Sequence, residues 1–70
     1  MSASEAIAAS LRGIRATRDE TQRQVAEAVG VACTTLSSWE RRGGIGLADA
    51  WKLADHYGVS IDELAGRKHG

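Results

Sequence analysis

An all-α fold built from five short helices is the prediction from this sequence of 70 residues. Apolar residues recur at helical spacing in five successive segments, and the helix formers Ala, Leu, Arg and Glu are frequent. Proline and phenylalanine are absent, and β-branched and aromatic residues are too sparse for strands. A chain this short has room for one core, so we expect a single domain over residues 1–70, with its core at about 4–66 and a flexible tail at 67–70.

The first helix is expected at about Ser4–Thr17. Ser2 and Glu5 have the spacing of a capping box, in which each residue satisfies a free backbone N–H of the helix start. The apolar positions that follow are Ile7, Leu11 and Ile14.

The second helix is expected at about Gln22–Val29, after a second capping box formed by Thr21 and Gln24. Gly30 ends it, because glycine enters the left-handed backbone region without steric cost. Val31 then points inward, toward the core.

The third helix is expected to run from about Cys33 to Arg41, with Leu36 and Trp39 as its apolar positions. Its remaining face is unusually rich in hydroxyl groups. These come from Thr34, Thr35, Ser37 and Ser38.

Residues 43–46 are expected to form a flexible connector, followed by a fourth helix that Gly58 closes. The apolar positions of this helix are Leu47, Ala50, Trp51, Ala54 and Tyr57. Ser60 and Glu63 form a third capping box, which opens a short fifth helix with Ile61 and Leu64. We expect both tryptophans to lie in the core, because tryptophan on an apolar stripe is more often a core residue than a stacking surface.

The formal net charge is zero, yet the charges are unevenly distributed along the chain. Six of the nine basic residues precede Gly43, and they are Arg12, Arg15, Arg18, Arg23, Arg41 and Arg42. The acidic residues after it are Asp49, Asp55, Asp62 and Glu63. The molecule can therefore be polarised although its charges cancel.

Several classes of protein are excluded. One cysteine cannot form an intramolecular disulfide, and His56 and His69 lack zinc spacing, so no metal and no cofactor are expected. The chain has neither a membrane span nor a secretory leader, so we expect a cytoplasmic protein without membrane contact. No nucleophile or carboxylate pair surrounds His56, which we expect to be an exposed surface residue, and the loop at residues 44–46 lacks the Lys-Ser/Thr of a nucleotide site. The protein is therefore not expected to be an enzyme.

The second helix, the glycine turn and the third helix together have the length of a helix-turn-helix unit, with an ordinary helical hairpin as the alternative. A set of residues in and after this unit occurs in a fixed order and spacing: Thr21-Gln22, Ala26, Gly30-Val31, Leu36-Ser37, Trp39-Glu40, Leu53-Ala54 and Gly58-Val59-Ser60 through Leu64. In this ordered set the chain resembles the Cro/CI (Xre-type, lambda-repressor-like) DNA-binding repressors from Leu11 to Gly66. The resemblance implies a compact five-helix domain whose third helix lies in the DNA major groove.

Carried over by motif position, the resemblance implies two sets of DNA-contacting residues. The base-reading residues are Cys33, Thr34, Ser38 and Ser37. The phosphate-contacting residues are Gln22, Arg23, Thr35, Arg41, Arg42 and Gly44. Two questions stay open. Cys33 is either a small side chain that fits the groove or the thiol of a redox-sensing or metal-sensing repressor. The arginines of the first helix form either a solvated face or a supporting DNA contact.

The chain also departs from the family pattern. Ala32 replaces the usual Ser or Thr cap of the third helix, and Thr34 could take over that cap. Glu20 stands at a commonly apolar position, so we expect it to be exposed or paired with an arginine, with Arg18 and Arg23 in reach.

The expected function is sequence-specific recognition of double-stranded DNA by a transcriptional repressor, which binds a two-fold operator as a homodimer. The fifth helix and the residues after Leu64 are the expected dimer seam. The alternative is a protein-interaction module, such as an antitoxin or a regulator controlled by an anti-repressor, and a regulatory protein is a further expected partner.

Overall fold

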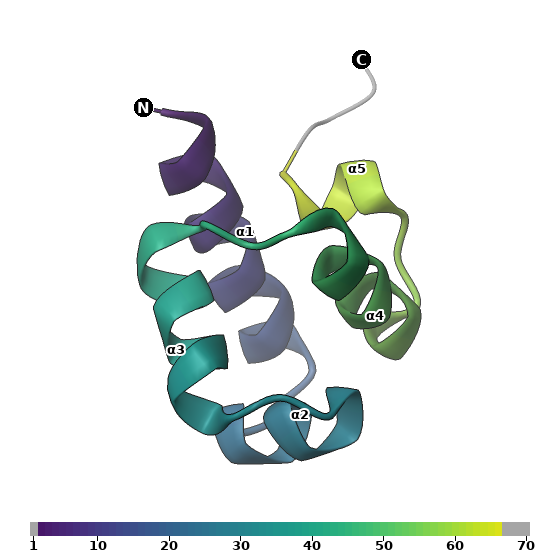
Figure 1. Cartoon of the computed structure of the whole chain (residues 1–70). Helices are drawn as coiled ribbons and strands as arrows, with labels where there is room; N and C mark the ends of the chain where they lie inside the picture. Colours follow the sequence, from purple (N-terminus) through teal and green to yellow (C-terminus); the bar gives the residue numbers. More distant parts are fainter. Residues whose placement is uncertain (1, 67–70) are drawn as a thin grey trace.

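The computed structural model describes residues 2–66, and every regular element in that range is a helix (Figure 1). The helices are α1 (Ala3–Thr17), α2 (Gln22–Val29), α3 (Cys33–Arg42), α4 (Leu47–Tyr57) and α5 (Ile61–Leu64). The all-α prediction is confirmed, and the helix bounds differ from those expected by one residue at the start of α1 and at the end of α3. The expected tail at 67–70 lies outside the described residues.

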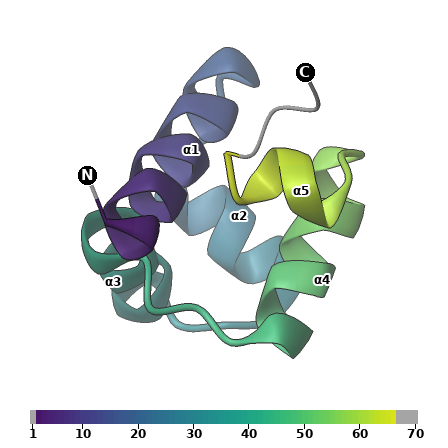
Figure 2. The ribbon, with the colours of Figure 1, turned by 90° about the horizontal axis from the view of Figure 1, so that it is seen from above.

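The helices enclose a core to which all five contribute. α3 packs against α1 and α2, whereas α4 packs against α2 and α5. In two perpendicular views, α3 and α4 lie on opposite sides of the molecule (Figures 1 and 2). The most buried large apolar side chains are Leu11, Val25, Leu36, Leu53 and Leu64.

Helix termini follow the local sequence closely. All three expected capping boxes form, at Ser2, Thr21 and Ser60. α3 begins after Ala32 without any side-chain cap, so Thr34 does not take over that position. The lack of a cap leaves the backbone N–H groups of the first turn of α3 without a side-chain acceptor.

The prediction that both tryptophans are core residues is half wrong. Trp39 is 7% exposed, whereas Trp51 is 60% exposed and Leu47 is 71% exposed. The buried stripe of α4 consists of Ala50, Leu53, Ala54 and Tyr57. Trp51 lies one residue, or about 100°, away from that stripe, and Leu47 lies in the first turn, beyond the cover of the neighbouring helices.

The sequence suggested a flexible connector at residues 43–46, but its first residue is tightly packed. Gly43 is buried, has a left-handed backbone (φ +75°) and packs against the start of α1. A Cβ atom at this position would lie 2.0 Å from the carbonyl oxygen of Ser4. Gly43 is therefore a packed junction between α1 and the end of α3, whereas Gly44 and Gly46 have open space around them.

No helix within residues 2–66 has the length and hydropathy needed to cross a membrane.

Candidate nucleic-acid interface

α2 and α3 are joined by a tight turn whose geometry is fixed by hydrogen bonds and packing. Gly30 adopts a left-handed conformation (φ 78°), and the backbone N–H groups of Gly30 and Val31 both donate to the carbonyl of Ala26, at 2.9 and 3.0 Å. Val25, Ala26 and Leu36 are buried beneath the turn. This arrangement holds the two helices at a fixed angle.

The residues expected to read bases all lie on α3, and they differ in accessibility. Cys33 and Thr34 are exposed, whereas Ser37 and Ser38 are half-buried. Thr34, Ser38 and Arg41 follow one another at intervals of four and three residues, so they share one face of the helix. That face presents small hydroxyl groups leading to a guanidinium, a combination suited to base edges and a neighbouring phosphate.

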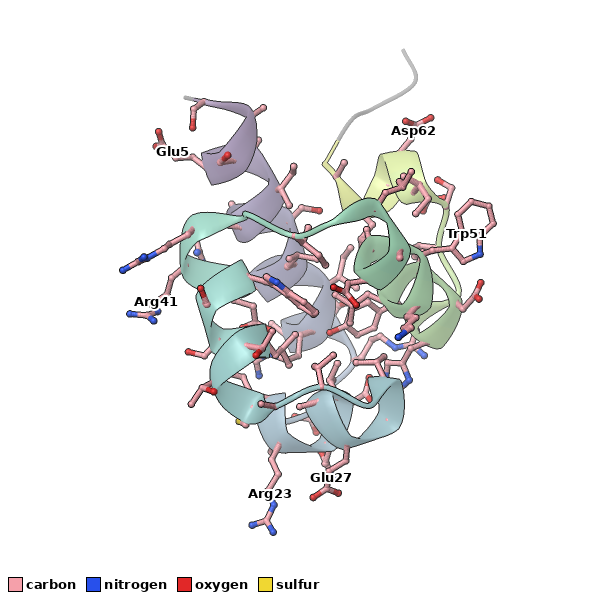
Figure 3. The ribbon with its side chains drawn as sticks, in the orientation of Figure 1. Glu5, Arg23, Glu27, Arg41, Trp51 and Asp62 are labelled. Atoms are coloured by element: carbon pink, nitrogen blue, oxygen red, sulfur yellow. The ribbon has the colours of Figure 1, made fainter. Side chains whose placement is uncertain are left out.

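The residues expected to contact phosphates are divided between free and engaged side chains. Arg41 and Arg42 are exposed, and neither makes an ion pair or hydrogen bond within residues 2–66. Thr35 and Gly44 are likewise exposed. Arg23 pairs with Glu27 of the next turn at 3.2 Å, and both side chains project from α2 into solvent (Figure 3).

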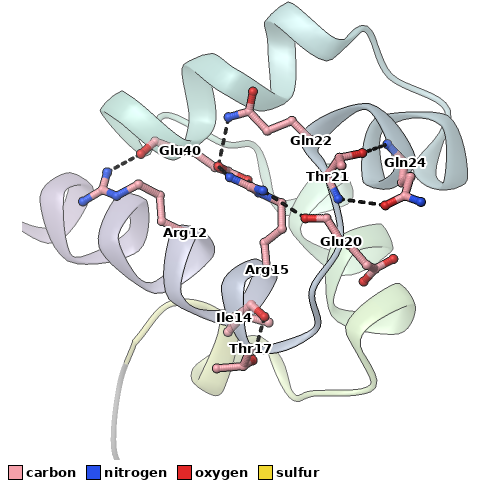
Figure 4. A network of polar contacts seen from close by, with 9 residues as sticks. All are labelled: Arg12, Ile14, Arg15, Thr17, Glu20, Thr21, Gln22, Gln24 and Glu40. Carbon is pink, nitrogen blue, oxygen red and sulfur yellow. Dashed lines mark hydrogen bonds and ion pairs between the residues drawn. The ribbon is translucent and has the colours of Figure 1, made fainter.

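The side chain of Gln22, the first residue of α2, is hydrogen-bonded to another residue of the chain. Its Nε2 donates to Oε1 of Glu40 at 3.1 Å (Figure 4). An amide nitrogen has two hydrogens, so this bond fixes the side chain and leaves the second N–H for an outside acceptor. Glu40 thus positions the amide of Gln22. The phosphate contact expected at the start of α2 remains a proposal.

Sequence reasoning missed the buried polar centre of this interface. Glu40 is 2% exposed, and its carboxylate accepts from Arg15 Nε at 2.8 Å and from Arg15 Nη2 at 3.0 Å. Its backbone carbonyl accepts from Arg12. The bonds from Arg15 and from Gln22 join α1, α2 and α3 at one carboxylate (Figure 4). The sequence did hold a signal for this burial: Glu40 follows the apolar Leu36 by four residues, which places it on the inner face of α3.

Glu40 stabilises the charged form of Arg15. Hydrogen bonding to Glu40 raises the pKa of the Arg15 guanidinium, and this effect outweighs the opposing effect of burial. A bidentate, charge-assisted contact of this kind fixes orientation as well as distance. The pair therefore sets the position of α3 relative to α1.

The arginines of α1, together with Arg18 directly after it, make contacts that neither sequence-based alternative contained. Arg12 and Arg15 donate to Glu40, and Arg18 Nη1 donates to the carbonyl of Tyr57 at 3.0 Å. Arg15 Nη1 also donates to the carbonyl of Glu20 at 3.0 Å. These side chains connect α1 to the turn before α2 and to the ends of α3 and α4.

Glu20 is paired with an arginine, as expected, but its second partner was not foreseen. Its carboxylate lies 3.4 Å from Arg18 Nε and 2.9 Å from His56 Nε2. The prediction of an exposed His56 is wrong, because its side chain is only 23% exposed. The last turn of α4 packs beside the turn that follows α1, which brings His56 to Glu20.

Tyr57 yields a prediction for alkaline pH. The side chain is 2% exposed, and burial, reinforced by Glu40 and Glu20, raises the pKa of its hydroxyl from 10.0 to about 12. The unfolded chain therefore loses this proton first as pH rises, so the stability is complete below pH 10 and falls between pH 10 and 12. We expect a loss of about 2 kcal/mol by pH 12, measurable by urea unfolding across this range.

Tyr57 is the only tyrosine, so absorbance of the tyrosinate reports its titration directly. The Tyr57→Phe variant should lack this component of the pH dependence. A midpoint near pH 10 in the folded protein would contradict the prediction.

Comparison with known proteins agrees with the geometry. Residues 11–64, well over half of the chain, match the family model described as helix-turn-helix. Neither the curated proteins nor the solved structures gave a significant match to this chain. In the described part of the chain, no three His, Cys, Asp or Glu side chains are grouped as a metal site would require.

Proposed function

This chain belongs to the Cro/CI (Xre-type) helix-turn-helix family and is thus a DNA-binding transcription regulator, and we propose that it is a repressor that binds a two-fold operator as a homodimer. The observation that carries the proposal is the outer face of α3. There, small polar side chains precede two arginines that have no partner within residues 2–66.

The polar character of α3 suits readout of base edges. The major groove accepts one helix, and Thr or Ser can contact a base through the hydroxyl or, for Thr, through the methyl group. We assign base contacts to Cys33, Thr34, Ser37 and Ser38. Because these side chains are short, each gives limited discrimination, and two half-sites are needed for a specific complex.

Affinity in this proposal comes mainly from phosphate contacts. We assign these to Gln22, Arg23, Thr35, Arg41, Arg42 and Gly44. Each phosphate neutralised by a basic side chain adds about −0.9 to the slope of log affinity against log salt concentration. These residues lie along α2, α3 and the connector after α3, so they can follow the two groove edges on either side of the reading helix.

The test is fluorescence anisotropy with labelled duplexes over a series of salt concentrations, followed by selection of preferred sequences. We expect salt-dependent binding to random duplexes and a two-fold symmetric selected site. Absence of binding below about 100 mM salt would exclude the DNA-binding proposal, since electrostatic contacts strengthen at low salt. A selected site without two-fold symmetry would exclude the homodimer.

Two substitutions separate base readout from phosphate contact. Ser38→Ala should change the preference at one or two base pairs, whereas Arg41→Ala should weaken all sequences alike and reduce the salt slope by about 1. Parallel selections and salt titrations measure both effects.

Each substitution has a matched control. Ser4→Ala removes the same hydroxyl from the exposed start of α1 and should leave sequence preference unchanged. Arg41→Lys keeps the charge and should retain most of the salt slope. Equal behaviour of Ser38→Ala and Arg41→Ala would show that α3 is not the reading helix.

A further inference from the structure

The start of α3 is exposed, yet its side chains are small and mostly apolar. Ala32, Cys33 and Thr34 follow one another there, and all three are exposed. Ala32 presents a methyl group, Cys33 a thiol that behaves as a small apolar group, and Thr34 one methyl and one hydroxyl group. None of these side chains makes a hydrogen bond within residues 2–66. A Ser or Thr at position 32 would cap the helix, so the stability of the fold does not explain Ala32.

Thr34 occupies the centre of the exposed face of α3. At about 100° per residue, it lies nearly opposite the buried stripe that contains Leu36 and Trp39. The N-terminal residues of a recognition helix are the ones that contact base edges. In a complex with DNA, Thr34 is therefore the side chain of α3 that enters the major groove most directly.

The side chains that read polar base edges are missing from this end of α3. Guanine is commonly read by Arg or Lys, adenine by Asn or Gln, and cytosine by Asp or Glu. Residues 32–38 contain none of these six types. The first long polar side chain on the same face is Arg41, two turns after Thr34. What remains for a small apolar side chain is the C5 methyl of thymine, the only apolar group that the four bases present in the major groove.

We propose that this protein recognises thymine methyl groups through Thr34, with Ala32 and Cys33 beside it, and that its operator half-site has thymine at one or two fixed positions. The inference rests on the proposed function and names the class of DNA sequence that the reading helix selects. Contact between two methyl groups removes apolar surface from water and needs no long side chain to be ordered. Because the Thr34 side chain has no hydrogen bond within residues 2–66, its methyl group is free to turn toward a base.

The test first removes the methyl group from the DNA alone. In the selected operator, each thymidine is replaced in turn by deoxyuridine, which keeps the pairing with adenine and every hydrogen-bonding group and lacks only the C5 methyl. Fluorescence anisotropy measures the affinity for each duplex. We expect binding to weaken about fourfold for each contacted methyl that is lost, the factor that corresponds to burial of one such group, and to stay unchanged at the other thymines.

Substitutions in the chain then locate the contact. Thr34→Ser keeps the hydroxyl and removes the methyl, so deoxyuridine at the contacted position should cause no further loss of affinity. Thr34→Val keeps a methyl at the same place, so the loss should remain. Thr35→Ser is the matched control, because it removes the same group about 100° away around the helix, and the effect of deoxyuridine should equal that in the original chain. Circular dichroism confirms that each variant is folded.

The outcomes distinguish this inference from the proposed function. If deoxyuridine weakens binding by Thr34→Ser as much as binding by the original chain, the methyl acts through DNA shape or another residue, and the inference is wrong. It is also wrong if no deoxyuridine weakens binding, or if the selected half-sites lack thymine. Salt-dependent binding to random duplexes persists in all three cases. Absence of that binding would instead contradict the proposed function.

Discussion

Replacement of Glu40 by alanine is expected to lower the free energy of unfolding by about 3 kcal/mol, the lower end of the range found when one partner of a buried ion pair is removed, because the side chain of Arg15 is 23% exposed. The substitution leaves the Arg15 guanidinium beside a void, without the carboxylate that accepts two of its hydrogen bonds. It also releases the amide of Gln22. Because a domain of this size has roughly 5 kcal/mol of stability in total, the variant should lose more than half of it and unfold at a clearly lower temperature and urea concentration, as measured by thermal and urea denaturation.

Glu27→Ala is the matched control for this prediction. Glu27 also pairs with an arginine, but its side chain is 70% exposed and that of Arg23 is 83% exposed. Exposed pairs contribute about 0–1 kcal/mol, so this variant should remain close to the original stability. Equal losses for the two glutamates would contradict the central role of Glu40.

A double replacement separates the ion pair from its consequences. Arg15→Met combined with Glu40→Leu removes both charges and keeps most of the volume, and such replacements are often neutral or stabilising. We therefore expect the double variant to be more stable than Glu40→Ala. Its DNA affinity should nevertheless change, because the carboxylate that positions Gln22 and α3 is gone. The cost then lies in the unpaired, partly buried charge of Arg15, whereas the pair itself specifies how α1 and α3 meet.

The helices and their ends could be predicted from the sequence because local interactions determine them. The capping boxes at Ser2, Thr21 and Ser60 each depend on residues three positions apart, and all three form. Gly30 ends α2 in the conformation that glycine alone adopts without strain. The exposed position of Thr34 on α3 follows from the burial of Leu36 and Trp39 on the opposite side, whereas Cys33, three residues before Leu36, is exposed as the first residue of the helix.

The features that sequence reasoning missed depend on contacts between distant segments. Arg15 and Glu40 are 25 residues apart, and neither periodicity nor charge count pairs them. His56 and Glu20 are 36 residues apart, and their contact is likewise not visible in the local sequence pattern. Trp51 was assigned to the core from its apolar character, although the buried stripe of α4 runs through Leu53 and Tyr57. In each case the arrangement of neighbouring helices, rather than the local pattern, decides which side chains are covered.

Gly43→Ala is expected to lower the free energy of unfolding by about 3–4 kcal/mol, near the upper end of the effects of single substitutions. Two causes act together at this position. An L-residue in the left-handed region costs about 1–2 kcal/mol, and the added Cβ would lie 2.0 Å from the carbonyl oxygen of Ser4, so the start of α1 has to move. Urea unfolding monitored by the fluorescence of buried Trp39, which lies one turn before Gly43, measures the loss.

Two other glycines separate these causes. Gly30 also has a left-handed backbone, yet nothing lies within 4 Å of its added Cβ, so Gly30→Ala should cost only the strain of about 1–2 kcal/mol. Gly44 has neither strain of this kind nor a close neighbour, and Gly44→Ala should change stability by less than about 0.5 kcal/mol. If the loss of stability is largest for Gly43→Ala, smaller for Gly30→Ala and smallest for Gly44→Ala, the contact with Ser4 is identified as the additional cause. If Gly43→Ala costs no more than Gly30→Ala, the start of α1 yields easily, and the close packing of α1 against the end of α3 does not fix the reading helix.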